Sequence, residues 1–449
     1  MKVTVVGAGY VGLVTGVSLA NLGHDVICVD VNSERVARIN RGEPPIHEPG
    51  LAEMLERVIG QKRFSATTSL SDAMRGSELS MIAVGTPARA EGIDLSYVRE
   101  AARQLGGLLS VAAPYHVVVV KSTVVPGTTS TLVGREVEAA SGKKLGEFGL
   151  CMNPEFLCEG TAVADFTNSD RIVIGQSDAK AGRVVAELYA SFTCPVVTTS
   201  VRNAEMIKYT SNTLLATMIS FSNEIAGLCE NVPDCDIDAV MDALHLDRRL
   251  SPMVDGKRVR PGILSYLRAG SGYGGSCLPK DIYALRMFAR EQQVSTPLLD
   301  AVSQVNACRP SAVVARVEKK VGRLKGKTIA LLGLAFKPGT DDMRCSPAFD
   351  VLACLREAGA KVQAYDPMAK PSDIAAHGEG VTLGREPAEV LARANAAVIT
   401  TAWPEIPTWD WPSLAKTMAQ PHVIDARNAF RRVSWPAPVQ YTPVGVSAV

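Results

Sequence analysis

The sequence predicts an α/β protein in which two doubly wound parallel-sheet domains are joined by a helical central domain with one long helix. Three observations predict this fold. A strand–turn–helix–strand unit opens the chain, a degenerate copy begins near residue 325, and a long helical stretch lies between them. The chain has 449 residues, too many for a single hydrophobic core. We expect domains over residues 1–200, 201–310 and 311–449.

The N-terminal unit carries the residues of a dinucleotide-binding turn. An apolar strand, KVTVV, runs into Gly7, Gly9 and Gly12 with G-x-G-x-x-G spacing, and the next strand ends at Asp30. These glycines permit a tight turn, close approach of a pyrophosphate and close helix–strand packing. A carboxylate at Asp30 would accept hydrogen bonds from a ribose diol and repel a 2′-phosphate. We therefore expect a Rossmann-like domain that binds NAD rather than NADP.

The central stretch, residues 202–231, has apolar residues at helical spacing and only one glycine, which predicts one long helix. Its apolar positions are too many for one face, so we expect a homodimer formed through this helix. Lys208 and Asn212 are four residues apart and share a face. Taken from the helix alone, an exposed lysine beside a surface asparagine is the commoner arrangement.

The third segment repeats the first in a degenerate form. GKTIALLGLAFK is a strand running into a glycine turn at Gly333, and GAKVQAYDP is a strand ending at Asp366. The second and third glycines of the motif are missing, and a polar insertion, KPGTDDMRCSP, lies between the two strands. We therefore expect a Rossmann-like domain that binds a different nucleotide. Two nucleotide sites indicate a nicotinamide cofactor and a nucleotide-linked substrate.

Composition excludes several other classes of function. The net charge is +1, which gives no reason to expect nucleic acid as a partner. No apolar run is long enough to span a membrane, and the chain opens directly with a strand, so we expect a cytoplasmic protein. The ten cysteines include no C-x-x-C pair, so we expect no metal site. Most of them should be buried small residues.

With these residues assembled, the chain resembles the UDP-glucose/GDP-mannose dehydrogenase family over essentially its whole length. The resemblance rests on six motifs in the expected order: GAGYVGLV, STVVPGT, NPEFLCEGTAVADF, IKYTSN, GYGGSCLPKD and GLAFKPGTDDMRCSP. It implies an NAD-dependent, two-step oxidation of the C6 alcohol of a nucleotide sugar to a carboxylate. The expected substrate is UDP-glucose.

The resemblance also implies catalytic roles for individual residues. Cys277 in GYGGSC would attack the intermediate aldehyde, because a thiohemiacetal can lose a second hydride and become a thioester. Lys208 would stabilise the oxyanion, and Asn212 would hold the same oxygen or a water. Asp281 would orient a catalytic water, Glu155 would be the base for thioester hydrolysis, and Thr123 would hold a second water.

The binding residues follow from the same resemblance. The cofactor contacts that it implies are Gly7, Gly9, Val11, Gly12, Asp30, Arg35, Thr86, Thr123, Glu159, Lys280 and Arg344. The implied substrate contacts are Glu155, Phe156, Leu157, Cys158, Glu159, Lys208, Asn212, Tyr266, Leu267, Arg268, Ala269, Gly270, Gly274 and Lys337. Among these, Tyr266 would stack on the uracil ring.

One segment departs from the family pattern. In relatives, an arginine that reaches the neighbouring subunit lies a few residues before the segment written here as YLRAG. In this chain the region is longer by about a dozen residues, as judged from that resemblance, and Arg248, Arg249, Arg258 and Arg260 are all candidates. Arg427 in DARN is either a substrate contact or part of a surface turn.

Three alternatives remain. The same chemistry could act on another nucleotide sugar, such as GDP-mannose, TDP-glucose or a UDP-N-acetylhexosamine. A simple hydroxyacid dehydrogenase would share the first domain and the Lys–Asn pair but would not need Cys277 or a third domain. A non-catalytic nucleotide-binding protein would not need Cys277, Lys208, Asn212 and Asp281 together.

Overall fold

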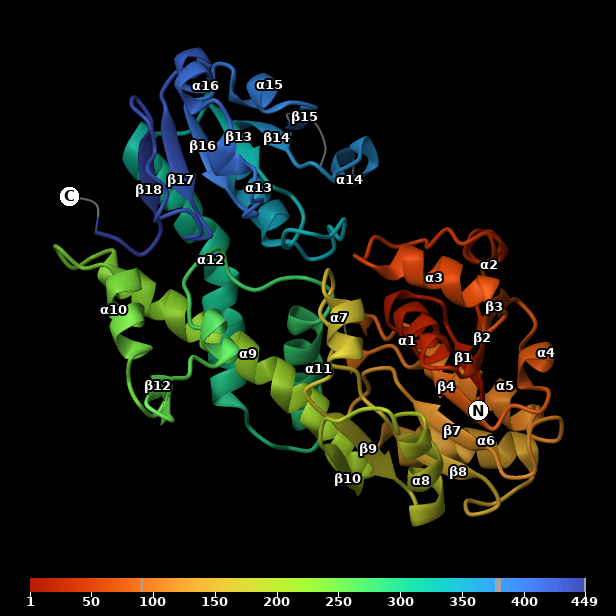
Figure 1. Cartoon of the computed structure of the whole chain (residues 1–449). Helices are drawn as coiled ribbons and strands as arrows, with labels where there is room; N and C mark the ends of the chain where they lie inside the picture. Colours follow the sequence, from red (N-terminus) through yellow and green to blue (C-terminus); the bar gives the residue numbers. More distant parts are fainter. Residues whose placement is uncertain (90–91, 376–380, 448–449) are drawn as a thin grey trace. The chain divides into compact units, whose positions relative to one another are not determined.

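The computed structural model describes residues 1–89, 92–375 and 381–447. The chain forms two compact units (Figure 1). The first comprises Met1–Ser211 with Tyr283–Gln292, and the second comprises Asn212–Ile282 with Gln293–Val449. Among the described residues, no helix is both long and apolar enough to cross a bilayer.

The first unit is built on a sheet that has eight strands in the described residues, ordered β10-β9-β8-β7-β4-β1-β2-β3. The strands are β1 (Lys2–Val6), β2 (Asp25–Val29), β3 (Phe64–Thr67), β4 (Leu79–Ile82), β7 (Val117–Val120), β8 (Gly149–Met152), β9 (Ile172–Gln176) and β10 (Val196–Ser200), with a separate hairpin of β5 (Ala88–Arg89) and β6 (Gly92–Ile93). All neighbours run parallel except β8 and β9, which are antiparallel, a reversal that the sequence did not indicate.

Helices cover both faces of this sheet. They are α1 (Tyr10–Asn21), α2 (Ser33–Asn40), α3 (Leu51–Gly60), α4 (Leu70–Met74), α5 (Ser96–Gly107), the π-helix η1 (Thr129–Val133), α6 (Gly134–Ser141), α7 (Ala162–Thr167) and α8 (Ala179–Glu187). The four valines of β7 are fully buried. Val117 and Val119 belong to one core cluster and Val118 and Val120 to another. Alternate residues of a strand face opposite sides, so this sheet is doubly wound, as predicted.

The second unit holds a parallel sheet with the order β15-β14-β13-β16-β17-β18, six strands in the described residues. Its strands are β13 (Thr328–Leu332), β14 (Lys361–Tyr365), β15 (Val381–Leu383), β16 (Ala396–Ile399), β17 (His422–Asp425) and β18 (Gln440–Pro443). The sheet helices are α13 (Pro347–Glu357), α14 (Pro371–Ala375), α15 (Pro387–Leu391), η3 (Ile406–Thr408) and α16 (Trp411–Thr417). The central strands follow the same order as in the first sheet, which confirms the predicted repeat.

The equivalent acids of the two units have different surroundings. Asp366, directly after β14, accepts hydrogen bonds from the N–H groups of Leu334 and Ala335 and from the indole of Trp403 at 2.7–2.9 Å. Its Oδ2 is therefore occupied by the protein itself.

The predicted long helix is α9 (Val201–Cys229), which begins in the first unit and continues into the second. The remaining elements between the sheets are α10 (Ile237–Leu244), β11 (Met253–Val254), β12 (Lys257–Arg258), η2 (Gly262–Tyr266), α11 (Leu278–Glu291) and α12 (Pro297–Val321). The lengthened segment before YLRAG forms the β11–β12 hairpin, with Asp255 and Gly256 at positive φ in its turn.

Candidate active site

The turn between β1 and α1 leaves room for a dinucleotide. Gly7 has a φ of +104°, and a Cβ there would lie 2.6 Å from the Ala83 carbonyl oxygen, while a Cβ on Gly12 would lie 1.8 Å from Gly7 O. A Cβ on Gly9 would meet no atom within 4 Å. In the described structure no side chain caps α1 at Gly9, so the N–H groups of its first turn, which includes Val11, can receive a pyrophosphate. These features fit NAD.

Asp30 follows β2, as predicted, and its carboxylate already accepts hydrogen bonds from the protein. Oδ2 accepts hydrogen bonds from Ala8 N at 2.9 Å and Arg35 Nη1 at 3.0 Å, and Oδ1 accepts one from Asn32 N at 2.9 Å. Each carboxylate oxygen has two acceptor sites, so Oδ1 can still accept a ribose hydroxyl. The Arg35 ion pair places a cation beside this carboxylate.

Two predicted threonines lie side by side in this unit. Thr86 Oγ1 donates to the backbone carbonyl of Thr123 at 3.0 Å. The loop after Thr123 is held by Glu205, a fully buried residue of α9, which accepts from Gly127 N at 2.5 Å and Thr129 N at 2.8 Å. Burial raises the pKa of Glu205, although these hydrogen bonds oppose the rise.

Glu155 and Lys208, both predicted site residues, form a buried ion pair. Lys208 Nζ lies 2.7 Å from Glu155 Oε1, and the two side chains are 4% and 6% exposed. Glu155 Oε2 accepts the Leu157 N–H at 2.7 Å. Burial would raise the pKa of Glu155, but the charge and hydrogen bond of Lys208, the Leu157 N–H and the charge of Lys121 lower it below its usual value. The carboxylate is therefore ionised at neutral pH.

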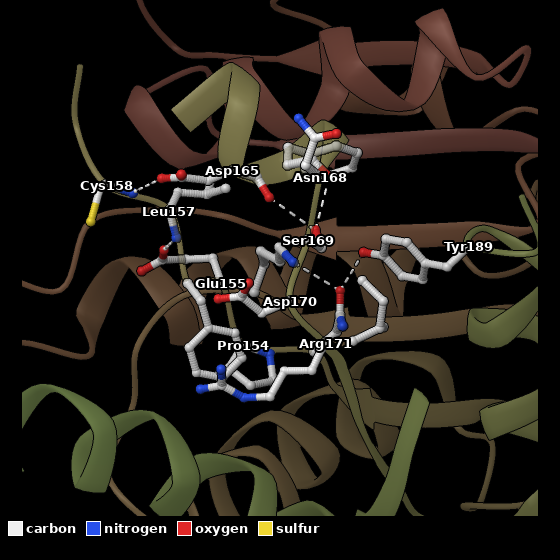
Figure 2. Close-up of a pocket in the computed structure, with 15 residues that line it drawn as sticks. Pro154, Glu155, Leu157, Cys158, Asp165, Asn168, Ser169, Asp170, Arg171 and Tyr189 are labelled. Atoms are coloured by element: carbon white, nitrogen blue, oxygen red, sulfur yellow. Dashed lines mark hydrogen bonds between the residues drawn. The ribbon is translucent and has the colours of Figure 1, made fainter. Parts of the chain in front are cut away.

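Glu155 lines a cavity of about 200 Å³ in the first unit. Figure 2 shows charged and polar side chains around it, from the loop after β8 and the segment that leads into β9. The lining residues are Lys121, Asn153, Pro154, Glu155, Phe156, Leu157, Cys158, Asp165, Phe166, Asn168, Ser169, Asp170, Arg171, Ile172 and Tyr189. Its aromatic residues are Phe156, Phe166 and Tyr189, and the Arg171 guanidinium lies 4.1 Å from the centre of the Phe156 ring.

The loop that carries Glu159 is tied to the dinucleotide turn. Gly160 N donates to Glu48 Oε2 at 2.7 Å and to the Tyr10 hydroxyl at 3.1 Å, and Tyr10 also hydrogen-bonds to Glu48. Burial and this carboxylate raise the pKa of Tyr10 far above its usual value. Glu159 itself is half-buried and Cys158 is exposed.

In the second unit, Cys277 directly precedes α11 and is half-buried. Its Sγ lies 3.6 Å from Ser276 Oγ. Asp281, in the first turn of α11, is 1% exposed. Its Oδ2 accepts a hydrogen bond from Asn212 Nδ2 at 2.6 Å, and its Oδ1 pairs with Lys280 Nζ at 2.5 Å. Thus Lys280, implied as a cofactor contact, forms an ion pair with Asp281 here.

The glycines of GYGGSC are needed because another loop presses on them. A Cβ on Gly274 would lie 2.4 Å from Cys345 O and 2.5 Å from Pro347 Cδ. A Cβ on Gly275 would lie 2.9 Å from the Phe336 ring, and Gly275 N donates to Cys345 O at 3.1 Å. The polar insertion of the C-terminal repeat therefore fixes the backbone of the Cys277 loop.

Four implied substrate residues line a second cavity, of about 510 Å³, within the second unit. They are Tyr266, Arg268, Ala269 and Gly270, whereas Leu267 between them is buried. Arg427 lines the same cavity, and its Nη1 donates to Ser271 Oγ at 3.3 Å. Arg427 is therefore half-buried at this cavity and does not lie on an exposed surface turn.

The four candidate arginines before YLRAG are all exposed but differ in their partners. Arg249 pairs with Asp247 at 2.5 Å, and Arg258 donates to two backbone carbonyls of its own segment at 2.7 and 3.0 Å. Arg248 and Arg260 make no side-chain hydrogen bond or ion pair to any described residue, so they are the better candidates to reach a neighbouring chain.

Two further implied contacts have local partners. Arg344 pairs with Asp342 at 2.7 Å, and Lys337 Nζ lies 5.4 Å from the Phe336 ring centre.

The prediction that most cysteines are buried is wrong. Three are buried, four are intermediate, and three are exposed because they lie on loops or on a helix surface: Cys158, Cys308 and Cys345.

Several residues at these sites were missed by the sequence reasoning. Lys121 is 5% exposed and lines the Glu155 cavity. Its place directly after four valines, at the carboxyl end of a buried strand, was the available signal. Asp238, Arg431 and Arg432 line the second cavity, and no motif indicated them.

Comparisons with known proteins match the order of an NAD-binding domain, a central domain and a second nucleotide-binding domain along the chain. Three models of the UDP-glucose/GDP-mannose dehydrogenase family match: the NAD binding domain at residues 1–193, the central domain at 202–308 and the UDP binding domain at 330–432. No group of three or more metal-binding side chains occurs among the described residues.

The chain is 40% identical over 430 residues to the UDP-glucose 6-dehydrogenase TuaD of Bacillus subtilis (strain 168), covering 96% of this chain and 89% of the relative. It is 41% identical over 444 residues to the UDP-glucose 6-dehydrogenase of Rhizobium meliloti (strain 1021), covering 96% of each. A UDP-glucose dehydrogenase structure from the archaeon Pyrobaculum islandicum superposes with a TM-score of 0.89 at 38% identity, covering 99% of this chain and 98% of the other. The chain belongs to the UDP-glucose/GDP-mannose dehydrogenase family and is an NAD-dependent oxidoreductase with a nucleotide-sugar substrate.

Proposed function

We propose that this protein is a UDP-glucose 6-dehydrogenase that oxidises the C6 alcohol of UDP-glucose to the carboxylate of UDP-glucuronate in two steps. The observation that carries the proposal is the Cys277 loop. A half-buried thiol directly precedes a helix whose first turn holds Asp281, and Asn212 orients that carboxylate. A one-step alcohol dehydrogenase needs no such nucleophile.

NAD, when bound, supplies the hydride acceptor, and the chain supplies the nucleophile and the proton transfers. The Cys277 thiolate adds to the C6 aldehyde and forms a thiohemiacetal. Loss of a hydride from that carbon leaves a thioester, which water hydrolyses to the carboxylate and the thiol. The N-terminus of α11 follows Cys277 and favours its anionic form. Asp281 orients the water, and Asn212 holds Asp281.

The buried pair of Glu155 and Lys208 has complementary roles in this proposal. Lys208 stabilises the oxyanion that develops at C6. Glu155 is the general base that takes a proton from the hydrolytic water, a role for which it must be ionised. Its lowered pKa supports that role, and Thr123 holds a water nearby. We also propose that the residues implied as cofactor contacts bind NAD and that those implied as substrate contacts bind the nucleotide sugar.

We further propose that the protein acts as a cytoplasmic homodimer. Leu214, Phe221 and Leu228 recur every seven residues along α9 and are 49%, 49% and 62% exposed. An apolar stripe of this kind on a helix is typical of a helix–helix interface. The domain boundaries at residues 200 and 310 are part of the same proposal.

The test is the reaction stoichiometry on a panel of nucleotide sugars. Purified protein with NAD and UDP-glucose is expected to form two NADH per sugar and no released aldehyde. Cys277→Ser should stop after the first oxidation and accumulate a hemiacetal or aldehyde, while Cys308→Ser, at an exposed position, should leave the stoichiometry at two. Full turnover by Cys277→Ser would remove this residue from the mechanism.

A second candidate substrate is another nucleotide sugar, such as GDP-mannose or a UDP-N-acetylhexosamine. The observation that favours it is the lengthened, arginine-containing segment that leads into Tyr266 and the second cavity. The same panel distinguishes the two, because kcat/KM should be at least about tenfold higher for the true substrate, the ratio expected when a buried contact of about 1.4 kcal/mol is lost.

A further inference from the structure

A buried lysine lines the same cavity as Glu155. Lys121 follows β7 and is 5% exposed. Its Nζ donates to Asn153 Oδ1 at 2.9 Å, and that oxygen also accepts the Tyr189 hydroxyl at 2.6 Å. Among the described residues, Asn153 is the one hydrogen-bond acceptor for this ammonium. It has three donors, and the side chain lines the same cavity as Glu155.

Asn153 is itself held in place, so the position of Lys121 is well defined. Asn153 Nδ2 donates to the Val173 carbonyl of β9 at 2.8 Å, and the residue is 1% exposed. The amide oxygen is therefore directed toward Lys121 and Tyr189. A lysine held in this way beside a carboxylate acts as a fixed positive charge, because its side chain has little freedom to move.

The proposed chemistry requires Lys208 to act in two places. It pairs with Glu155 at 2.7 Å in this structure, yet it must also stabilise the oxyanion at C6. When Lys208 turns toward the substrate, Glu155 remains as a carboxylate that is 6% exposed. A buried charge left without a counter-ion is costly and takes up a proton instead. A protonated Glu155 could not accept a proton from the hydrolytic water.

We propose that Lys121 is a positioning residue, the fixed counter-ion that keeps Glu155 ionised and available as a base while Lys208 serves the substrate. The proposal rests on the proposed function, in which Glu155 is the base for thioester hydrolysis. Lys121 does not touch the reacting atoms, and it acts only through Glu155.

The titration behaviour is consistent with this role. Burial lowers the pKa of Lys121 to about 8, with Lys208 acting in the same direction and Glu155 opposing it. The ammonium is therefore charged across the neutral range and loses its proton above about pH 8. The charged groups around the cavity are Lys208 from α9, Asp165 from α7, and Asp170 and Arg171 from the segment before β9.

The first experiment measures Glu155 without any turnover. Protein labelled with 13C at glutamate carboxyls is titrated by NMR, and Glu155→Gln identifies the resonance. Lys121→Met, which keeps the side-chain length and removes the charge, should raise the pKa of Glu155, whereas Lys121→Arg should leave it near the wild-type value. Tyr189→Phe is the matched control, since it removes a partner of Asn153 without changing charge, and it should cause no shift.

The second experiment follows the hydrolytic step. With UDP-glucose and NAD, Lys121→Met should hydrolyse the Cys277 thioester about tenfold more slowly than wild type at pH 6, as expected when one nearby opposite charge is lost. The thioester should then accumulate and be seen by mass spectrometry. Above pH 8 the two rates should converge, because Glu155 is then ionised in the variant as well. The first NADH should form at an unchanged rate, and Lys121→Arg should restore the low-pH rate.

The outcomes separate the two proposals. A wild-type enzyme that forms one NADH per sugar contradicts the proposed function, but the NMR comparison still tests the Lys121–Glu155 interaction. A wild-type enzyme that forms two NADH, combined with equal pKa values for Glu155 in wild type and Lys121→Met, overturns the role of Lys121 alone. Equal slowing of Lys121→Met at pH 6 and pH 9 would indicate a structural defect and would also overturn it.

Discussion

The buried pair of Glu155 and Lys208 should be energetically coupled, and a double-mutant cycle can measure the coupling. At an N–O distance of 2.7 Å and an effective dielectric constant of about 20, two unit charges attract by about 6 kcal/mol. Desolvation offsets part of this attraction, and removing one partner of a buried pair typically costs about 3–5 kcal/mol. Lys121 still compensates the charge of Glu155 in part. We therefore expect Lys208→Met to lower the free energy of unfolding by about 3 kcal/mol, the lower end of that range.

Glu155→Gln should lower the free energy of unfolding by the same amount. The Lys208 side chain is only 4% exposed, and this variant removes the carboxylate that pairs with it. The double variant, Glu155→Gln with Lys208→Met, buries no charge at either position and should be more stable than the sum of the single losses predicts. The coupling energy should be about 2 kcal/mol. Urea unfolding of the four proteins without ligands, followed by circular dichroism, provides the free energies.

The pH dependence of the free energy of unfolding tests independently whether the pair stabilises the folded protein. The pKa of Glu155 is lower in the folded protein than in the unfolded chain. The stabilisation by the pair is therefore complete above the unfolded value of about 4.3 and is lost as the pH falls below it. The gap in stability between wild type and Glu155→Gln should shrink in acid. Single-variant losses that add within about 0.5 kcal/mol at pH 7 would refute the coupling.

Three other changes test the remaining sites. Asp30→Asn keeps the hydrogen bond from Ala8 and removes the charge beside Arg35, so the ratio of kcat/KM for NADP to that for NAD should rise about tenfold; an unchanged ratio would show that Asp30 does not face the ribose. Arg427→Ala should raise KM for the nucleotide sugar about tenfold or more with kcat changed less than about twofold, and a pure loss of kcat would contradict a binding role. Phe221→Glu should shift the protein from dimer to monomer in analytical ultracentrifugation with its circular dichroism unchanged, because an exposed apolar side chain of the proposed interface becomes charged; an unchanged dimer would exclude this stripe of α9.

The backbone architecture could be predicted because its signals are local. The first two strands of each repeat are short apolar runs that end at a glycine or an acid, and Gly7, Asp30, Gly333 and Asp366 stand at those ends. The long helix α9 was equally visible, since its residues contain a single glycine and no proline. These patterns depend on residues that are neighbours in the sequence.

The contacts at the site could not be predicted in the same way, because they join residues far apart in the chain. Glu155 and Lys208 are separated by 53 positions and Asn212 and Asp281 by 69. Neither pair follows from a spacing rule. Asp366 shows the same limit, since its position after β14 matches Asp30 but the Trp403 indole that occupies it comes from a different strand end.

The distribution of thiols has a practical consequence for handling the protein. Cys158, Cys308 and Cys345 face solvent while Cys277 is half-buried, so an alkylating reagent will meet several other thiols at least as accessible as Cys277. Alkylation rates follow both access and thiolate fraction. Inactivation by iodoacetamide would therefore not identify the nucleophile unless the modified peptide is located. Storage under reducing conditions will also matter, because two exposed thiols on separate molecules can form intermolecular disulfides that a gel would report as a false dimer.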